Sequence, residues 1–212
     1  MSREPYGRSA PWYDTLIEPL NSGLRQIGLR MYPPKQGMSV LDVGCGTGTH
    51  LDLYQSAGCK VFGIDSSPAM LDVARHKLGP QAELHQGDAA HMPYENGTFD
   101  LVMVTLTLHE MPPQTRSAVL DEMTRVLKPG GRILVIDYHP GPLRFPKGWF
   151  TKALITIIEF LAGWEHFRNQ RHFLRSGGAP TLADQHGLSI SESKIVTGGN
   201  LGLYLLNQGS RR

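Results

Sequence analysis

The sequence is poor in cysteine, in net charge and in long hydrophobic runs. Its 212 residues include two cysteines, Cys45 and Cys59, too few for a disulfide framework, and we expect both to be small buried residues. The net charge of +2 is too small to indicate a nucleic-acid partner. The chain has no run of about 18 apolar residues that would indicate a membrane-spanning helix, and its first residues lack the apolar core of a signal peptide. These absences predict a cytoplasmic protein.

The sequence does contain a regular alternation of apolar strands and amphipathic helices. Strands are predicted over 38–43, 59–65, 82–87, 99–109 and 131–139, and helices over 49–57, 67–79 and 112–128. This alternation indicates βαβ units and a parallel sheet. Two further strands, 188–196 and 201–207, flank TGGN and predict an antiparallel hairpin. We expect an α/β fold with a doubly wound sheet, mostly parallel, with a C-terminal antiparallel strand pair and helices on both faces.

A glycine-rich stretch, VLDVGCGTGTHL at 40–51, joins the first predicted strand to the first helix. It holds Gly44, Gly46 and Gly48, whereas one glycine would suffice for a turn. Glycine permits positive φ and lets a ligand contact the backbone, and doubly wound sheets bind ligands at this edge. The spacing GxGxG departs from the dinucleotide fingerprint GxGxxG, because Thr49 occupies the third position. The loop therefore predicts a ligand site but argues against a nicotinamide oxidoreductase.

Three carboxylates narrow the chemical class of the ligand that the loop binds. Asp65 ends the second predicted strand, where an acid accepts both ribose hydroxyls of any adenosine cofactor. Asp42, two residues before the loop, suits a cationic amino-acid group better than a pyrophosphate. Asp88 follows the third predicted strand and is placed to accept a hydrogen bond from an adenine amine.

Four pieces of sequence occur in an order and spacing typical of one enzyme family. They are VLDVGCGTG, VFGIDSSPAMLDVAR, GDAAHMPYENGTFDLVMV and VLKPGGRILVID. Together they resemble the class I S-adenosylmethionine (SAM) dependent methyltransferases, particularly the ubiquinone- and menaquinone-type enzymes. The resemblance covers residues 38–139 and weakens over 140–175. It implies a Rossmann-like fold, SAM as the cofactor and one domain over 1–212, with a helical N-terminal lid (about 1–36) and a helical insertion (about 143–175) over the active site.

The resemblance also implies which residues bind SAM. These are Tyr13, Asp42, Gly44, Cys45, Gly46, Gly48, Asp65, Ser66, Met70, Asp88, Ala89 and Thr105. Within this set, Ser66 and Met70 would flank the adenine, Asp88 with Ala89 would hold its edge, and Thr105 would face the methionine. Tyr13 would belong to a lid over the cofactor, although packing of an N-terminal helix explains the aromatics there equally well.

Three residues are candidates for the acceptor side of the site. His109 ends the fourth predicted strand, and Tyr138 and His139 follow the fifth. Methyl transfer from a sulfonium needs mainly alignment, but a phenol, enol or amine acceptor also loses a proton. Histidine titrates near neutrality and suits that task. We rank His109 first as the base and Tyr138 second; the alternative is that His109 lines the pocket passively.

A metal site is not expected. Metal-assisted methyl transfer would need clustered acids near the acceptor, and Asp137 has no partner acid in the nearby sequence. His166 and His172 are six residues apart, which is not the three- or four-residue spacing of helical ligands.

The segment 143–175 has two interpretations. It carries six cations against two acids around the apolar centre ALITIIEFLAGW, which is too short to span a bilayer. It is either a lid helix packed on the domain or a helix that rests on an anionic membrane surface, with Trp149, Phe150 and Trp164 at the interface.

The predicted function is SAM-dependent transfer of a methyl group to a small, partly apolar acceptor of quinone, lipid or phenol type. The alternative is a non-catalytic SAM-binding or partner-binding protein. The sequence identifies neither the acceptor, nor the atom that is methylated, nor the oligomeric state.

Overall fold

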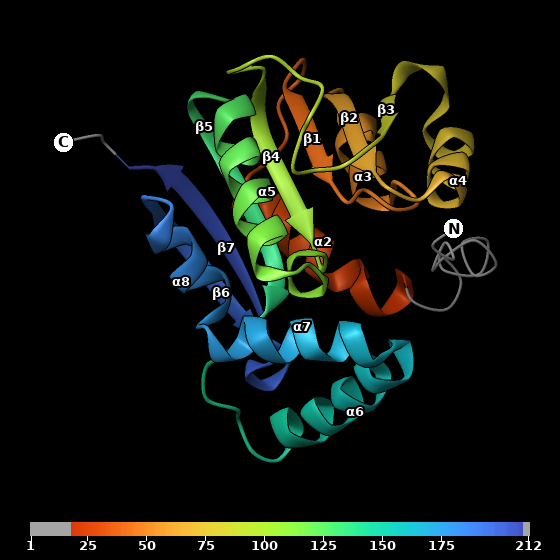
Figure 1. The fold of residues 1–212 in the computed structure, drawn as a ribbon. Helices are drawn as coiled ribbons and strands as arrows, with labels where there is room; N and C mark the ends of the chain where they lie inside the picture. Colours follow the sequence, from red (N-terminus) through yellow and green to blue (C-terminus); the bar gives the residue numbers. More distant parts are fainter. Residues whose placement is uncertain (1–17, 210–212) are drawn as a thin grey trace.

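The computed structural model describes residues 18–209, and within this part of the chain seven strands form one mixed sheet (Figure 1). The strands are β1 (Ser39–Val43), β2 (Lys60–Asp65), β3 (Glu83–Gln86), β4 (Phe99–Thr105), β5 (Leu127–Tyr138), β6 (Leu188–Val196) and β7 (Leu201–Gln208). Their order is β3-β2-β1-β4-β5-β7-β6. The first five are parallel, and β7 runs antiparallel to both β5 and β6. The predicted fold class and hairpin are confirmed.

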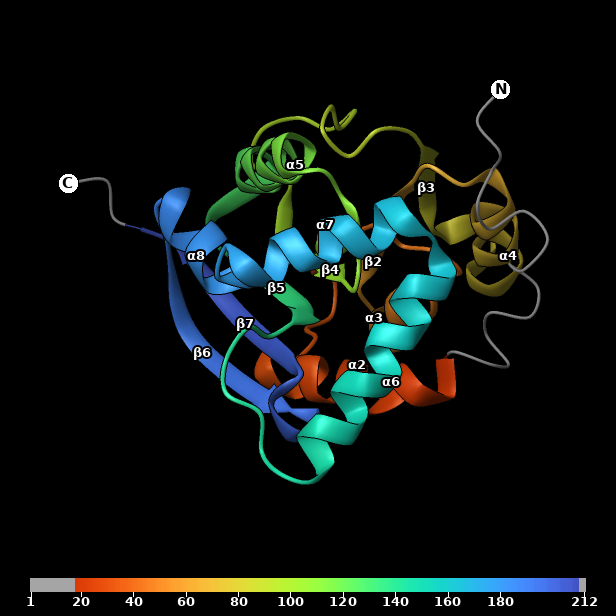
Figure 2. The same cartoon turned by 60° about the horizontal axis from the view of Figure 1, so that its bottom comes forward.

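Helices cover both faces of the sheet (Figures 1 and 2). One face packs against α2 (Glu18–Met31), α3 (Thr49–Ser56) and α4 (Pro68–Leu78), and the other against α5 (Pro113–Val126) and α8 (Gly178–Gln185). Short 3₁₀ turns are η1 (Gly79–Gln81), η2 (Leu108–Glu110) and η3 (Thr197–Gly199). The remaining two helices, α6 (Lys147–Ala162) and α7 (Trp164–Arg175), lie across the carboxyl ends of the central strands. We call α6 and α7 the lid helices.

Local sequence explains several of these elements. Strand β4 is apolar on both faces because Leu101 and Met103 enter one core while Val102 and Val104 enter the other, as expected for a strand covered on both sides. Helix α4 begins where predicted, since the Ser67 hydroxyl accepts a hydrogen bond from the Met70 backbone N–H (3.3 Å) and a proline follows the cap. Cys45 and Cys59 are buried free thiols, as expected.

The predicted strand over 99–109 is wrong in its last part. Strand β4 ends at Thr105, because Leu106 has a φ of 53° and turns the chain away from the sheet. The Leu106 N–H still donates to the Ile136 carbonyl (2.7 Å), after which the chain forms η2. His109 therefore lies in a buried turn below the sheet edge, 3% exposed, and not at a strand end.

Candidate functional site

A cavity of about 620 Å³ opens at the carboxyl ends of β1, β2 and β4. This is the edge where doubly wound sheets bind ligands, and the volume is typical of a small-molecule site. Ten of the predicted SAM-binding residues line it: Asp42, Gly44, Cys45, Gly46, Asp65, Ser66, Met70, Asp88, Ala89 and Thr105. Gly48 lies behind the lining, and Tyr13 falls outside the described residues.

The three loop glycines have positive φ angles but different surroundings. The angles are 72°, 52° and 75° at Gly44, Gly46 and Gly48. A Cβ added at Gly44 would lie 2.6 Å from the Thr107 side chain, and one at Gly48 would lie 2.8 Å from Leu78. No atom lies within 4 Å of a Cβ built on Gly46. Packing therefore requires glycine at Gly44 and Gly48, whereas Gly46 leaves backbone open toward the cavity.

Asp65 holds two turns together at the end of β2. One carboxylate oxygen accepts the Gly46 N–H at 2.8 Å, and the other accepts the Ser67 N–H at 2.9 Å. Burial raises the pKa of this carboxyl, although the backbone hydrogen bonds oppose the shift. A buried carboxylate at this position can bind hydroxyl groups of a ligand while it orders the glycine loop.

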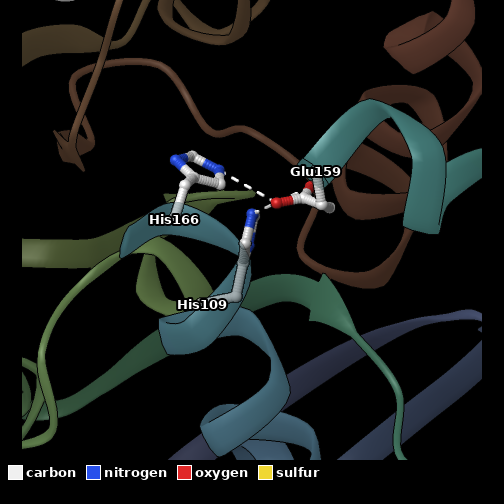
Figure 3. Close-up of side chains that lie close together, drawn as sticks. All are labelled: His109, Glu159 and His166. Carbon is white, nitrogen blue, oxygen red and sulfur yellow. Dashed lines mark ion pairs between the residues drawn. The ribbon is translucent and has the colours of Figure 1, made fainter. Parts of the chain in front are cut away.

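A second polar cluster lies between the sheet and the lid helices (Figure 3). The Nδ1 of His109 is 2.7 Å from Oδ1 of Asp137, a fully buried residue of β5. Its Nε2 faces two other acids, Glu159 Oε1 at 3.6 Å and Glu110 Oε1 at 4.0 Å. His166 of α7 lies 3.0 Å from Glu159 through Nε2. Glu110 also lines the cavity, so this cluster adjoins the predicted cofactor site.

Tyr138 belongs to this cluster and His139 does not. The Tyr138 hydroxyl donates to Glu159 Oε1 at 2.7 Å, and its ring centroid is 4.5 Å from that of His109. Nδ1 of His139 instead forms a hydrogen bond with the Tyr204 hydroxyl at 2.6 Å. Of the three predicted acceptor-side residues, the fold brings His109 and Tyr138 together and directs His139 to β7.

The charges in the cluster shift one another's pKa values. Burial alone would lower the pKa of His109, but Asp137, aided by Glu110 and Glu159, raises it to about 9. Burial raises the pKa of Glu110, whereas at Glu159 the neighbouring histidines and Tyr138 outweigh burial and lower the pKa. Burial and Glu159 both raise the pKa of Tyr138. At neutral pH these shifts favour a protonated His109 and a neutral Tyr138 hydroxyl beside Glu159.

Comparison with known proteins identifies the family. Residues 40–131 match a family model described as a methyltransferase domain. An uncharacterized methyltransferase from Synechocystis sp. PCC 6803 is 30% identical over 202 residues, which cover 90% of this chain and 89% of that protein. This chain belongs to the SAM-dependent methyltransferase family. The methyltransferase therefore uses SAM as its cofactor.

Two further relatives of the methyltransferase have named acceptors. A demethylmenaquinone methyltransferase from Lactococcus lactis is 39% identical over 132 residues, which cover 59% of this chain and 52% of that protein. The chain thus spans about half the length of that relative. A chloroplastic 2-phytyl-1,4-beta-naphthoquinone methyltransferase from Arabidopsis thaliana is 29% identical over 220 residues, covering 93% of this chain and 83% of that protein.

Solved structures agree with this methyltransferase in fold. A SAM-dependent methyltransferase from Aquifex aeolicus superposes with a TM-score of 0.63 at 21% identity, over 93% of this chain and 98% of that one. At this identity the match shows the Rossmann-like fold alone, which agrees with the predicted architecture.

Three polar residues near the site were not predicted from the sequence of this methyltransferase: Glu110, Glu159 and His166. Asp137 was expected to have no partner acids, but the structure places Glu110 and Glu159 beside the histidine that Asp137 holds. One signal was available. Glu159 is the single charge within ALITIIEFLAGW, and a lone acid in an apolar helix needs a buried partner.

Proposed function

We propose that this methyltransferase transfers the methyl group of SAM to a small, partly apolar acceptor of quinone, lipid or phenol type. The observation that carries the proposal is the junction of two sites. A cavity whose lining suits SAM meets, at Glu110, a polar cluster beneath the lid helices. One side of this junction holds the cofactor, and the other holds the acceptor.

The cavity residues fit SAM. We assign Asp65 to the ribose hydroxyls, the backbone around Gly46 to the methionine part, and Asp88 with Ala89 to the adenine edge. Support comes from the open space at Gly46 and the inward position of Asp65. Asp42, Gly44, Cys45, Ser66, Met70 and Thr105 complete the proposed set, while Gly48 acts behind the loop through its packing. Tyr13 stays a prediction.

On the acceptor side we assign His109 and Tyr138. Bound SAM supplies an electrophilic methyl group, so the protein's task is to align an acceptor atom with it. Neither residue lines the cavity, and Glu110 connects them to it. His109, held by Asp137, acts by positioning Glu110 and Glu159, and Tyr138 orients Glu159 through its hydroxyl. We assign no direct role to His139, because its ring is hydrogen-bonded to the Tyr204 hydroxyl.

The acceptor class rests on two observations. Relatives named for demethylmenaquinone and for a phytyl naphthoquinone align with this chain. The lid helix α6 carries exposed apolar side chains, among them Trp149, Phe150 and Phe160, at 64%, 75% and 59% exposure. A prenylated acceptor needs such a surface for its tail.

The same helix supports the proposal of peripheral membrane contact. No helix in the described part of the chain is long and apolar enough to cross a membrane. Cationic side chains accompany the exposed apolar residues of the lid. They are Arg144, Lys147, Lys152, Arg168, Arg171 and Arg175. Apolar and cationic side chains together favour an anionic lipid surface as the occupant.

The test is a turnover assay. The purified chain is incubated with SAM and a reduced 1,4-naphthoquinone, with and without a prenyl side chain, and S-adenosylhomocysteine is measured together with the mass of the acceptor. We expect one added methyl group on the prenylated quinol. SAM binding without S-adenosylhomocysteine formation, across quinol, phenol and thiol acceptors, would favour the alternative of a non-catalytic SAM-binding or partner-binding protein.

A further inference from the structure

Four side chains from three separate elements converge under the lid helices. His109 and Glu110 come from η2, Glu159 from α6 and His166 from α7. His109, Glu159 and His166 each offer one possible metal-ligand atom. These three atoms lie within 4.8 Å of one another. Figure 3 shows the two imidazole rings directed toward the Glu159 carboxylate from different helical turns. Chain segments up to 57 residues apart in sequence thus present donor atoms to one point.

The separations are those of atoms that share an ion. Two ligands about 2.1 Å from a zinc ion at a tetrahedral angle lie roughly 3.4 Å apart. Nε2 of His109 is 3.6 Å from Glu159 Oε1, and Nε2 of His166 is 3.5 Å from Glu110 Oε1. Both distances exceed a normal hydrogen bond. Nε2 of His166 is 3.0 Å from Glu159 Oε2, so this pair would move apart by a few tenths of an ångström around an ion. The His109 Nε2–Glu110 Oε1 distance is 4.0 Å, somewhat longer than the separation expected of two zinc ligands.

Outer hydrogen bonds hold these donors in place. Asp137 lies against Nδ1 of His109 and accepts its proton, so an ion that displaces the second proton would meet the lone pair on Nε2, the atom that faces the other donors. The Tyr138 hydroxyl fixes the Glu159 carboxylate at 2.7 Å. His109 and Glu159 thus each have an outer partner, the arrangement that orients metal-binding side chains in proteins.

Charge also favours a cation at this point. Glu159 and Asp137 are 4% and 0% exposed, and Glu110 stands beside them. Buried carboxylates need compensating positive charge. We propose that His109, Glu159 and His166, with Glu110 as the fourth ligand, bind one divalent transition-metal ion. Two imidazoles with carboxylates favour zinc or a neighbouring metal over magnesium or calcium, which prefer oxygen ligands alone.

A bound ion would link three parts of the molecule. It would join α6 and α7 to η2 and so fix the lid helices over the carboxyl ends of the strands. Because Glu110 also lines the cofactor cavity, the ion would lie at the cavity wall, within reach of an acceptor oxygen. The inference concerns metal binding and does not rest on the proposed function, since it can be tested without SAM or an acceptor.

The first measurement is zinc binding by titration calorimetry. The full chain is treated with a chelator, dialysed, and titrated with zinc chloride at neutral pH. We expect one saturable site per chain. His166→Gln should weaken binding by roughly 100-fold or more, since even outer partners of metal ligands contribute 10–100-fold. His172→Gln is the matched control, because His172 is exposed on the same helix outside the cluster, and its affinity should equal that of the wild type.

The second measurement is thermal unfolding. Zinc at a hundredfold excess over Kd should raise the Tm of the wild type and of His172→Gln by roughly 5–10 °C, and that of His166→Gln by much less. If His166→Gln does not fold, Glu110→Gln takes its place in both experiments. Absence of saturable zinc binding by the wild type, or equal binding by the cluster variant and the control, would overturn the proposal and leave protonated histidines as the counter-charges.

Discussion

At the residue scale, one hydrogen bond couples the two most informative positions of the sequence. The Gly46 N–H donates to Asp65, so the carboxylate proposed to bind ribose also fixes the loop proposed to contact methionine. The two residues have separate signals in the sequence, the first in the spacing of its glycines and the second in its place at the end of a strand. Their contact explains why a change at either position should reduce SAM binding.

Asp65→Ala should weaken SAM binding roughly 10²–10⁴-fold. The change removes two charge-assisted hydrogen bonds to ribose, about 1.5–3 kcal/mol each. Calorimetry with SAM measures the effect. Asp72→Ala is the control, because Asp72 is an exposed carboxylate on the following helix whose ion pair is with Arg75. Near-normal affinity in Asp65→Ala would remove the ribose assignment.

Gly46→Val should abolish measurable SAM binding, while Gly37→Val should not. Both glycines have positive φ (52° and 78°), and a Cβ at either meets no atom within 4 Å. The backbone strain of the two substitutions is therefore similar, but Gly46 alone of the two lines the cavity. If both variants lost SAM binding, the cause would be backbone strain and not lost contact with the cofactor.

His109→Ala should lower kcat by roughly 10²-fold, the typical cost of misplaced groups at a reacting centre, while the Kd for SAM stays within a few-fold of the wild-type value. The reason is that His109 faces Glu110 and Glu159 but does not line the cavity. Stopped assays with the active acceptor give kcat and KM, and calorimetry gives the Kd. The experiment includes Tyr138→Phe, which should lower kcat less. An unchanged kcat in His109→Ala would make the residue a packing element.

At the element scale, the sequence predicted those elements whose signals are local. The start of α4 follows from Ser67 and Pro68, and the β6–β7 hairpin from two apolar runs around TGGN. The end of β4 was missed because the apolar run continues to Leu108 while Leu106 takes a positive φ. Residue type gives no sign of that turn, since leucine seldom adopts it.

The residues that line the cavity were largely predictable, and the polar cluster was not. Cavity residues follow strand ends, so their positions come from the periodicity of the sheet. The cluster instead joins η2 to Glu159 and His166, which lie about 50 positions or more later in the chain. A break between the two lid helices decides how these side chains meet. Gly163, with a φ of 132°, separates α6 from α7 and turns His166 back toward Glu159. No spacing rule within one helix anticipates such a meeting.

Helix α6 should give the methyltransferase modest, salt-sensitive binding to vesicles that contain anionic lipid. Its exposed aromatic residues suit the interface, and each nearby cation contributes about 1 kcal/mol, which salt screens. Trp149→Ala with Phe150→Ala should reduce binding in a flotation assay at low salt. Ile190→Ala with Ile195→Ala is the matched control, since these exposed residues lie on β6.

The outcomes of the flotation assay separate the two interpretations of the lid helices. Binding at low salt that falls at high salt and in the α6 variant supports membrane contact. No flotation of the wild type at low salt would return α6 to the role of a packed lid, with its cations solvated.

At the scale of the whole molecule, the cavity and the polar cluster draw on different parts of the chain. Residues up to Tyr138 build the five parallel strands and the cavity, whereas the cluster also needs α6 and α7, which lie across the strand ends before the chain returns to the sheet as β6 and β7. The two apolar cores, one on each face of the sheet, are shared by both parts. A loss of sheet stability should therefore disturb the cavity and the polar cluster together.

We expect one buried histidine to make the stability of this sheet sensitive to acid. His50 of α3 is 1% exposed, and its Nδ1 contacts the Thr105 hydroxyl (3.1 Å) at the end of β4. Burial, with a smaller effect of Arg25, lowers its pKa to about 3. An unfolded histidine has a pKa near 6.5. Between these two values the unfolded state binds one more proton than the folded state, so the free energy of unfolding falls as pH falls, by about 1.4 kcal/mol per pH unit.

His50→Gln should remove this dependence. Glutamine keeps a polar group near Thr105 but does not titrate, so between pH 6.5 and pH 4.5 the wild type should lose about 2 kcal/mol more unfolding free energy than the variant. Urea unfolding at a series of pH values measures both curves, and the difference between them cancels the acids and histidines that the two proteins share. Parallel curves would show that His50 takes up its proton as readily in the folded protein as in the unfolded chain, and the buried contact between α3 and β4 would then have to open to water as the pH falls below about 6.5.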